Sequence, residues 1–535
     1  GAAIYNDNLS CYIPFRVLLQ NPNILNNIKY TYGLKKVIVS FKWNNIDIEY
    51  LKIDYDLMIA SYLLNYNIKD DISYLANQFD YGIPFYEVSY GKDNKFKDIS
   101  EREIASICVQ KAKFIYETHN RFITELEKEN MLDLFNKIEM PLVKVLADME
   151  YTGININVKT LDEIGEKLTI KLEELTNNIH SKADTIFNIA SPKQLGEVLF
   201  KKMGLPYPKK SKKTYSTDRD TLLKIKDENT IISDILEYRT LTKIYSSYVE
   251  GLKNNILSDG KIHTIFNQTL TRTGRLSSIE PNLQNIPIRM EEGRIIRKAF
   301  EATAGSSLMT SDYSQIELRI LAHISKAQNL IDAFNDDMDI HNKTAMDIFD
   351  VKEEDVTKDM RRKAKAVNFG IVYGISSFGL SENLDINPKE AELFISKYLN
   401  TYPSVKTYMD KVVKQAYEDG YVATIMNRKR VIDELKNTNY MIRKQGERMA
   451  LNAPIQGSSA DIIKKAMIDI YEEFKRLNLK SKMLIQVHDE LVFNVKEEEK
   501  HLVTNIVAEK MESAYKLSVP LKVDINFGFD WYEAK

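Results

Sequence analysis

The sequence predicts a multidomain α/β protein, and three observations lead to that fold class. The chain has 535 residues, too many for one hydrophobic core, so we expect about three or four domains. Hydrophobic residues make up 44% of it and charged residues 28%, which is typical of a folded globular protein. Short apolar runs of strand length alternate along the chain with longer segments of helical period.

Composition narrows the functional classes. No apolar run approaches the ~18 residues that a membrane helix needs, and the chain has no signal-like start. Cys11 and Cys108 are the only cysteines, so neither a disulfide framework nor a structural zinc site is expected. We therefore expect a cytosol-like compartment and no membrane partner. The net charge of −2 argues against a uniformly basic surface, although a balanced total can hide local clusters.

The N-terminal part, residues 1–125, mixes short apolar runs at 37–41 and 57–64 with helical segments. This mixture is typical of a compact α/β unit. The sequence begins with GAAIYN, which lacks an initial Met and has the residue pattern of a strand. We therefore expect that residues upstream have been removed or left out.

From 126 to 256 the pattern becomes helical and charged, and the stretch GLPYPKKSKK interrupts it. We predict an elongated helical arm with an exposed basic tip. The tip holds six lysines with no Asp or Glu among them: Lys201, Lys202, Lys209, Lys210, Lys212 and Lys213. A solvated loop explains this run as well as a grip on nucleic-acid phosphates does. Beyond 256 we expect strands, turns and longer helices, among them 405–420.

The segment RRKAKAVNFGIVYG repeats a pattern every fourth residue, with Arg361, Lys365, Phe369 and Tyr373 in step. On a helix these side chains form one stripe roughly 18 Å long, about the length of a nucleoside triphosphate. Two cations suit the phosphates, and two aromatic rings can stack on a base or a sugar. An ordinary amphipathic helix with a solvated basic end is an equally good reading of the stripe alone.

Asp312 lies where an apolar strand pattern changes to helical period within 307–324. A carboxylate at a strand end is held rigidly and faces an open edge, which suits a metal ligand. A simple N-cap for the following helix explains it equally well.

Asp489 follows the same logic in KMLIQVHDELVFNV, where two β-rich runs flank His488 and Asp489. This is a hairpin pattern. Leu491, Phe493 and Val495 share one face of the second strand, so the turn projects Asp489 outward. A plain polar turn is the alternative.

Two carboxylates on neighbouring sheet edges can bind two Mg²⁺ ions about 3.5–4 Å apart, as in phosphoryl transfer. The basic stripe would hold the triphosphate beside them. No GxxxxGK[ST] loop occurs, which argues against a P-loop motor.

These segments resemble those of a known family. DYSQIELR at 312–319, RRKAKAVNFGIVYG at 361–374 and VHDE at 487–490 resemble motifs A, B and C of the family-A DNA polymerases. TGRLSSIEPNLQNIPIR and NAPIQGSSADIIKKA match further segments of that family in the right order. The likeness is closest to the large, Klenow-type fragment of the bacterial members, the Bacillus type in particular.

The resemblance implies a right-hand polymerase fold of palm, fingers and thumb, joined to a ribonuclease H-like α/β domain of exonuclease type. It implies these domains: 1–125 as a vestigial, N-terminally truncated 3′–5′ exonuclease-like domain, 126–256 as a mainly helical thumb and connection, 257–324 as the first part of the palm, 325–447 as the fingers, and 448–535 as the second part of the palm.

For catalysis, the resemblance implies that Asp312, Asp489 and the backbone carbonyl of Tyr313 hold two Mg²⁺ ions, for which Mn²⁺ can substitute. One ion lowers the pKa of the primer 3′-hydroxyl and the other bridges the triphosphate. Glu490 would be an auxiliary acid. Lys365 would neutralise phosphate charge and protonate the departing pyrophosphate.

The resemblance likewise implies a dNTP pocket. Glu317 would be a steric gate whose carboxylate leaves no room for a ribose 2′-hydroxyl. Its other members would be Arg361, Lys365, Phe369, Tyr373, Gln315 and His341. Arg361 would contact phosphates, Phe369 would pack on the sugar and base, and Tyr373 would close the pocket. A lone His such as His341 is more often structural.

Residues that contact DNA are implied in the same way. Arg275 and Gln456 would donate to the minor-groove acceptors that every correct base pair presents in the same place. Others would hold the template or primer: Arg289, Arg448, Asn452 and His488. With this context the lysine-rich tip is better read as the end of a thumb that grips duplex phosphates through Lys209, Lys210, Lys212 and Lys213.

The N-terminal part departs from the family pattern. Gly33 and Val37 stand where the second exonuclease segment would supply a polar ligand and a carboxylate, and Lys111 stands where the third would supply Asp. A cation at a metal ligand's position repels Mg²⁺, so we expect no proofreading. The nearby acids Asp47 and Asp54, together with Asp56, are better explained as helix caps or surface groups.

The sequence therefore predicts a template-directed DNA polymerase, a nucleotidyltransferase that acts on primer–template DNA and dNTPs in repair and gap filling. We expect a monomer in the cytoplasm, associated with the nucleoid, and an organelle is also compatible. A two-metal nuclease is disfavoured because its acids are missing from 1–125. A non-catalytic DNA-binding scaffold is disfavoured because Asp312, Lys365 and Asp489 are all present.

Overall fold

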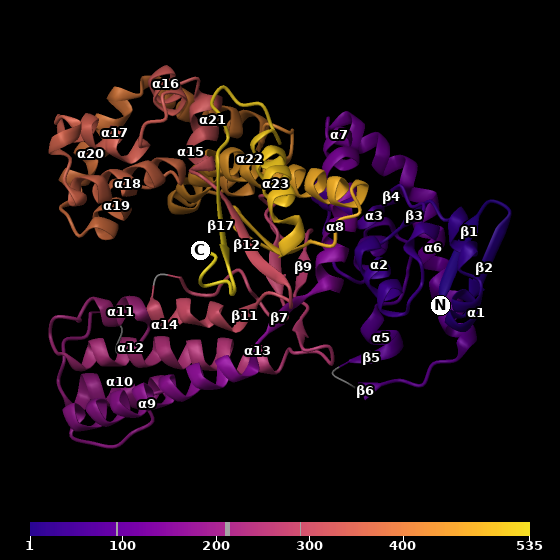
Figure 1. Cartoon of the computed structure of the whole chain (residues 1–535), viewed down its shortest axis with the longest axis horizontal. Helices are drawn as coiled ribbons and strands as arrows, with labels where there is room; N and C mark the ends of the chain where they lie inside the picture. The colour runs from indigo at the N-terminus through magenta and orange to yellow at the C-terminus, as the bar shows by residue number, and fades with distance from the viewer. Residues whose placement is uncertain (93–94, 209–214, 289) are drawn as a thin grey trace.

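The computed structural model describes residues 1–92, 95–208, 215–288 and 290–535. Figure 1 shows an N-terminal region on one side, a central sheet, a helical lobe above the sheet and a helical arm below it. None of the helices in these described ranges is long and apolar enough to cross a membrane.

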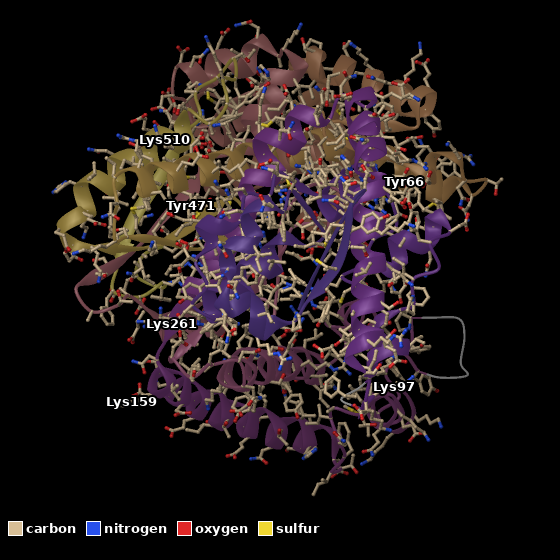
Figure 2. The ribbon with its side chains drawn as sticks, turned by 90° about the vertical axis from the view of Figure 1, so that its right-hand side faces the viewer. Tyr66, Lys97, Lys159, Lys261, Tyr471 and Lys510 are labelled. Atoms are coloured by element: carbon tan, nitrogen blue, oxygen red, sulfur yellow. The ribbon has the colours of Figure 1, made fainter. Side chains whose placement is uncertain are left out.

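The N-terminal region combines small sheets with helices. Strand β1 (Ala2–Asn6) pairs with β2 (Leu9–Ile13), which confirms the strand-like start, and β3 (Tyr30–Thr31) pairs with β4 (Tyr55–Asp56). Its main helices are α2 (Leu34–Trp43), α3 (Leu57–Leu63) and α6 (Glu101–Lys128). In Figure 2 this region faces the viewer, with Tyr66 labelled at its edge.

The apolar runs at 37–41 and 57–64 are helical rather than extended. Leu34, Ile38 and Phe41 follow helical spacing and form the buried face of α2. The Asp56 side chain accepts a hydrogen bond from the Met58 N–H and so caps α3. The caps and the spacing set the conformation here, whereas the short apolar runs suggested strands.

The predicted helical character of the arm is confirmed. The arm consists of α9 (Val158–Ala183), α10 (Pro192–Glu197), α11 (Arg219–Leu223) and α12 (Ile231–Ile244). The far half of the arm has a hydrophobic cluster of its own, which includes Leu195, Leu222 and Ile235. Helix α8 (Met140–Thr152) precedes the arm and packs instead against α2 and against α22 (Tyr440–Arg476).

The central sheet positions the site. Its four antiparallel strands run in the order β15 (Lys482–Val487), β16 (Glu490–Lys496), β12 (Ser306–Tyr313) and β17 (Val523–Gly528). In register, Asp312 lies opposite Glu490 on one side and Asp524 on the other. Met309 and Phe493 are fully buried in the sheet. Three strands thus bring acidic residues together at one end.

The helical lobe follows β12 and α15 (Ile316–Ser325). It contains α16 (Gln328–Asn335), α17 (Ile340–Phe349), α18 (Lys358–Val372), α19 (Ser377–Leu384), α20 (Pro388–Thr401) and α21 (Pro403–Asp419). The predicted helix at 405–420 is therefore confirmed. Helix α23 (Lys500–Glu512) packs against α22 beside the sheet.

Candidate active site

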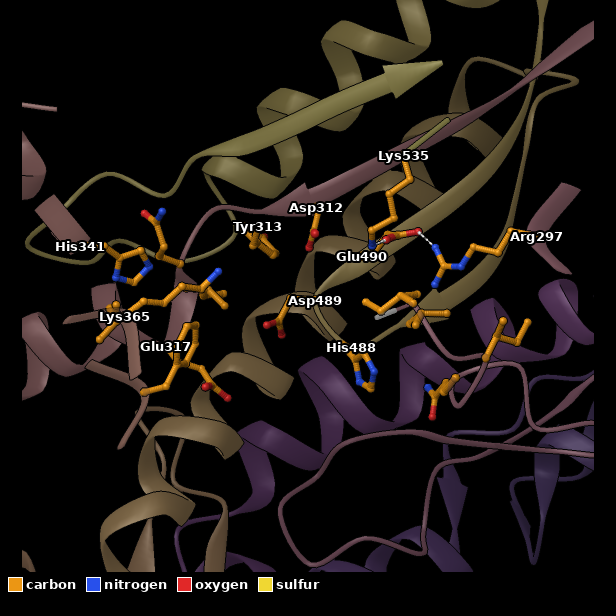
Figure 3. A pocket seen from close by; sticks show the side chains of 18 of the residues that line it. Arg297, Asp312, Tyr313, Glu317, His341, Lys365, His488, Asp489, Glu490 and Lys535 are labelled. Carbon is orange, nitrogen blue, oxygen red and sulfur yellow. Dashed lines mark hydrogen bonds and ion pairs between the residues drawn. The ribbon is translucent and has the colours of Figure 1, made fainter. Parts of the chain in front are cut away.

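A cavity of about 370 Å³ opens where the end of β12, the β15–β16 turn and helices α15, α17 and α18 meet. Figure 3 shows Asp312 and Asp489 facing one another across it, with His341 and Lys365 on one side and Arg297 and Lys535 on the other. Other predicted residues also line it: Tyr313, Gln315, Glu317, Arg361, Phe369, His488 and Glu490.

The predicted hairpin holds Asp489 in place. Strands β15 and β16 flank the turn, where His488 adopts a left-handed φ of 54°. The Tyr313 N–H donates to the Asp489 carbonyl oxygen at 3.2 Å, which ties the turn to the end of β12. The Ser459 hydroxyl donates to the Asp489 carboxylate at 2.9 Å. Both acids are therefore fixed relative to the sheet, as the patterns predicted.

The electrostatics of this acid pair fit a divalent cation. Burial raises the pKa of Asp312 to about 6, against the opposing field of Lys535, and the neighbouring acids add to the rise. Across the described part of the chain, neither Asp312 nor Asp489 has an ion-pair partner. The same residues include no group of three or more His, Cys, Asp or Glu arranged to hold a metal. Two carboxylates suit Mg²⁺, which typically takes its other oxygens from water and substrate phosphates.

Glu490 differs from the two aspartates because cations already neutralise it. It forms an ion pair with Lys535, and the Arg297 guanidinium lies 3.8 Å away. The Trp531 indole N–H donates to it at 2.9 Å. Its side chain is 2% exposed. The sequence did not identify these three partners, because they come from segments outside the motifs and only the tertiary fold brings them here.

Helix α18 presents three residues of the predicted stripe to the cavity, Arg361, Lys365 and Phe369, whereas Tyr373 is not among the residues that line it. Thr357 caps its start, and Tyr373 stands just past its last residue. The rings of Phe369 and Tyr373 are stacked, with centroids 6.5 Å apart. The Lys365 ammonium lies 6.0 Å from the Phe369 centroid and is exposed. In the described ranges it has no carboxylate partner, so it is available to an anion.

Two further residues modify the phosphate end of the stripe. Arg361 forms an ion pair with Asp339 at 2.8 Å, and Asp339 also caps α17. Asp339, the acidic cap two residues before His341, is a feature of the sequence that points to this ion pair, although it lies outside the motifs. Burial lowers the pKa of His341 to about 4, and its Nδ1 lies 3.0 Å from the Asn368 amide. His341 is therefore neutral at pH 7 and can offer a hydrogen bond but no charge.

Glu317 stands between the sheet and the stripe. The Arg275 guanidinium donates to its carboxylate at 2.7 Å. Burial raises the pKa of Glu317 despite this partner. The pKa of Tyr373 rises to about 12, through burial first and the adjacent Glu317 carboxylate second. Glu317 and Tyr373 were predicted in one pocket and Arg275 at the minor groove, and in the structure the three side chains form one contact group.

Among the predicted DNA contacts that the structure describes, His488 lines the cavity and the others do not. Arg448, Asn452 and Gln456 all lie on α22, and the Asn452 amide donates to the Val372 carbonyl at the end of α18 at 3.5 Å. Some predicted contacts lie outside the described residues: Arg289, Lys209, Lys210, Lys212 and Lys213.

Three acids of the N-terminal region, Asp47, Asp54 and Asp56, have the structural or surface positions predicted for them. Asp47 caps a short helix, and Asp56 is buried and accepts from the N–H groups of Gly33 and Leu34. Asp54 is exposed beside Lys29. They are helix caps and a surface group, so the prediction for them is confirmed.

Comparison with known proteins places these features in a family. The description "DNA polymerase family A" matches residues 158–533, and "DNA polymerase I, ribonuclease H-like domain" matches residues 1–118. DNA polymerase I of Bacillus subtilis (strain 168) is 47% identical over 100% of this chain, and that of Geobacillus stearothermophilus is 45% identical over the same share. The chain spans 62% of the length of each of these relatives.

A solved structure is also similar. The POL domain of Pol1 from M. smegmatis, in complex with DNA primer-template and dNTP, superimposes with a TM-score of 0.85 at 35% identity. The match covers 97% of this chain and 89% of that one. The comparisons confirm the predicted resemblance and the predicted right-hand fold with a ribonuclease H-like domain.

Proposed function

Because this chain belongs to DNA polymerase family A, we propose that it catalyses template-directed DNA synthesis, adding deoxynucleotides to a primer 3′-hydroxyl. One observation carries the proposal: two carboxylates without ion-pair partners among the described residues, Asp312 and Asp489, face the basic and aromatic stripe of α18 across one cavity. This arrangement suits phosphoryl transfer, in which negative charge must be held beside a metal-binding acid pair.

We propose that Asp312 and Asp489, with the backbone carbonyl of Tyr313, hold two Mg²⁺ ions, for which Mn²⁺ can substitute. When bound, such ions lower the pKa of an attacking hydroxyl and neutralise charge on the triphosphate. Glu490 acts behind them as an auxiliary acid, because its own charge is already balanced by Lys535 and Arg297.

The stripe binds the triphosphate of the incoming nucleotide. Lys365 is exposed and without a carboxylate partner in the described ranges, so it can contact the phosphates and give a proton to the departing pyrophosphate. Arg361 must share its charge with Asp339. Phe369 packs on the sugar and base, and neutral His341 donates a hydrogen bond to a phosphate, with Gln315 beside it at the cavity wall.

Glu317 selects the sugar. Its buried carboxylate, held by Arg275 and adjacent to Tyr373, fills the space that a 2′-hydroxyl would need. Arg275 also donates hydrogen bonds, together with Gln456, to minor-groove acceptors at the primer end. The template or primer is held by Arg448, Asn452, His488 and Arg289. The lysines 209, 210, 212 and 213 grip duplex phosphates.

These roles correspond to a division of the chain. We assign 1–125 to the exonuclease-like domain, 126–256 to the thumb and connection, 257–324 and 448–535 to the palm, and 325–447 to the fingers. The enzyme acts as a monomer in repair and gap filling. Proofreading is absent, because Gly33, Val37 and Lys111 replace the polar and acidic ligands that a second metal site requires.

A primer-extension assay tests the proposal. The chain is given Mg²⁺, a labelled primer on a template and all four dNTPs. Template-dependent lengthening of the primer is expected. Shortening of the primer would favour the nuclease alternative, and binding of DNA without any change in primer length would favour the scaffold.

A further inference from the structure

Three hydrogen bonds connect the N-terminal region to the Glu317 carboxylate. The Tyr62 hydroxyl on α3 donates to the Thr271 carbonyl oxygen at 2.6 Å. The Thr271 hydroxyl donates to the Arg275 carbonyl oxygen at 2.6 Å. The Arg275 guanidinium then donates to Glu317 at 2.7 Å. The path crosses from one matched domain into the other in a single step, at Tyr62.

A second bond from the N-terminal region reaches the same loop. The Arg272 guanidinium donates to the Asn65 side-chain oxygen at 2.9 Å. Thr271 and Arg272 are adjacent in sequence, and Tyr62 and Asn65 lie within one helical turn of each other. Two neighbouring points of the loop are therefore tied to one end of α3.

Arg428 also holds the loop, and it lies beside Tyr62. A Cβ on Gly274 would come within 2.4 Å of the Arg428 side chain, so the loop lies directly against it. Arg428 is itself immobilised, because its guanidinium donates to the Asp461 carboxylate at 2.8 and 2.6 Å. The loop 271–275 is thus held both by α3 and by Arg428, which neighbours Tyr62.

Tyr62 is buried, so water cannot easily replace its hydrogen bond to the Thr271 carbonyl. Tyr62 is 7% exposed, so loss of its hydroxyl would leave the Thr271 carbonyl without a donor in a place that water reaches poorly. By contrast, the Tyr66 hydroxyl donates to Glu125 at 2.8 Å, a residue of the same N-terminal region. Tyr62 therefore makes a hydrogen bond between the two regions, whereas Tyr66 makes one within the N-terminal region.

We propose that the ribonuclease H-like region braces the sugar-selecting pocket through the loop 271–275, with Tyr62 as a positioning residue for Arg275 and Glu317. The inference rests on the proposed polymerase function. It gives this region a role that needs no nuclease activity. With the brace weakened, Arg275 holds Glu317 less firmly, and the carboxylate can leave the space that excludes a 2′-hydroxyl.

The first experiment compares Tyr62→Phe with Tyr66→Phe as a matched control. The measured quantity is the ratio of kcat/KM for a dNTP to that for the corresponding rNTP. Losing one buried hydrogen bond should narrow this ratio about three- to tenfold in Tyr62→Phe. Tyr66→Phe should leave it unchanged. Melting temperatures of both variants separate selectivity from a general loss of stability.

A double-mutant cycle tests whether the path is continuous. Thr271→Val removes the next hydroxyl, and it should narrow the ratio to a similar extent. Because both changes break one path, the double variant should be no worse than the more affected single variant. Full additivity of the two effects would overturn the brace, as would a Tyr62→Phe ratio equal to that of Tyr66→Phe. Failure of the wild-type chain to extend a primer would instead overturn the proposed function.

Discussion

The molecule contains two groups of buried or half-buried carboxylates that lie in opposite electrostatic states. In the first, which we call the buried ion cluster, Glu139 and Asp461 are paired with Arg428 and Lys464. All four side chains are at most 3% exposed. Burial alone would raise the pKa of Glu139, but Lys464 and Arg428 lower it to about 2.

In the second group, the cavity, Asp312 has the opposite shift. Its pKa is raised to about 6, and within the described ranges no cation pairs with it. The difference shows that pairing with a cation, rather than burial, sets the direction of the pKa shift in these two groups. The buried ion cluster holds η4 (Phe135–Glu139), α22 and the segment before β14 (Lys429–Val431) together.

The largest effect should come from removing a cavity carboxylate. We expect Asp489→Asn to lower nucleotide incorporation by at least about 10³-fold, because the proposed metal ligand would lose its negative charge. Duplex binding and unfolding should change little. Single-turnover incorporation and a DNA-binding titration measure the two properties.

Asp524→Asn is the control for this change. Asp524 lies opposite Asp312 in the sheet, but its carboxylate accepts from the Ser314 hydroxyl and it does not line the cavity. Its incorporation rate should stay close to that of the parent. If Asp489→Asn kept the parental rate, the cavity would not be the acid site that the comparison requires.

The next largest effect should be on stability, in the buried ion cluster. Arg428→Met leaves Glu139 and Asp461 without their shared partner, and breaking a buried pair costs about 3–5 kcal/mol of unfolding free energy. Denaturant unfolding measures it. Arg476→Met, which removes an exposed pair with Glu473, should cost less than about 1 kcal/mol. Equal losses for the two variants would mean that the cluster contributes no more than a surface pair.

Local patterns were sufficient to predict the elements that carry the proposed catalytic residues. The hairpin around Asp489, the strand-to-helix change after Asp312 and the stripe on α18 each depend on residues close in sequence. Alternation or helical period therefore revealed them. The runs at 37–41 and 57–64 were too short for period to distinguish helix from strand.

The partners of the proposed catalytic residues could not be predicted in this way. Lys535 reaches Glu490 only because the C-terminal segment after β17, which is paired with β12, turns back toward the start of β16. Arg275 and Glu317 were each given a separate role, yet they contact one another. Pairing between distant segments depends on tertiary packing, which leaves no periodic signal in one sequence.

A smaller effect, on selectivity, should follow from Glu317→Ala. Removing the carboxylate opens the space for a 2′-hydroxyl, and discrimination against ribonucleotides should fall about 10- to 200-fold. Competition between a dNTP and the matching rNTP measures it. Glu382→Ala, an exposed acid on α19, is the control. An unchanged preference in Glu317→Ala would remove it from the sugar-selecting role.

The last prediction is that the N-terminal region shows no 3′–5′ cleavage of a primer. Two-metal hydrolysis needs converging acids that cations have not already neutralised, and in the described ranges Asp312 and Asp489 have no ion-pair partner. The acid beside Lys111 is Asp71, at 3.5 Å, and it is engaged. Its carboxylate accepts from the backbone N–H groups of Ser73 and Tyr86 at 3.1 and 2.7 Å.

We therefore expect a primer with a mismatched 3′ end to stay full length when incubated with Mg²⁺ and no dNTP. The measurement is made on the parent and on Asp489→Asn, because the variant removes any cleavage that the polymerase cavity could cause. Mg²⁺-dependent shortening that persists in Asp489→Asn would place a second acid site in the N-terminal region. Asp56 and Asp71 would then have to exchange their hydrogen bonds from backbone N–H groups for metal ions. Engagement by backbone N–H groups would then no longer mark a carboxylate of this chain as structural.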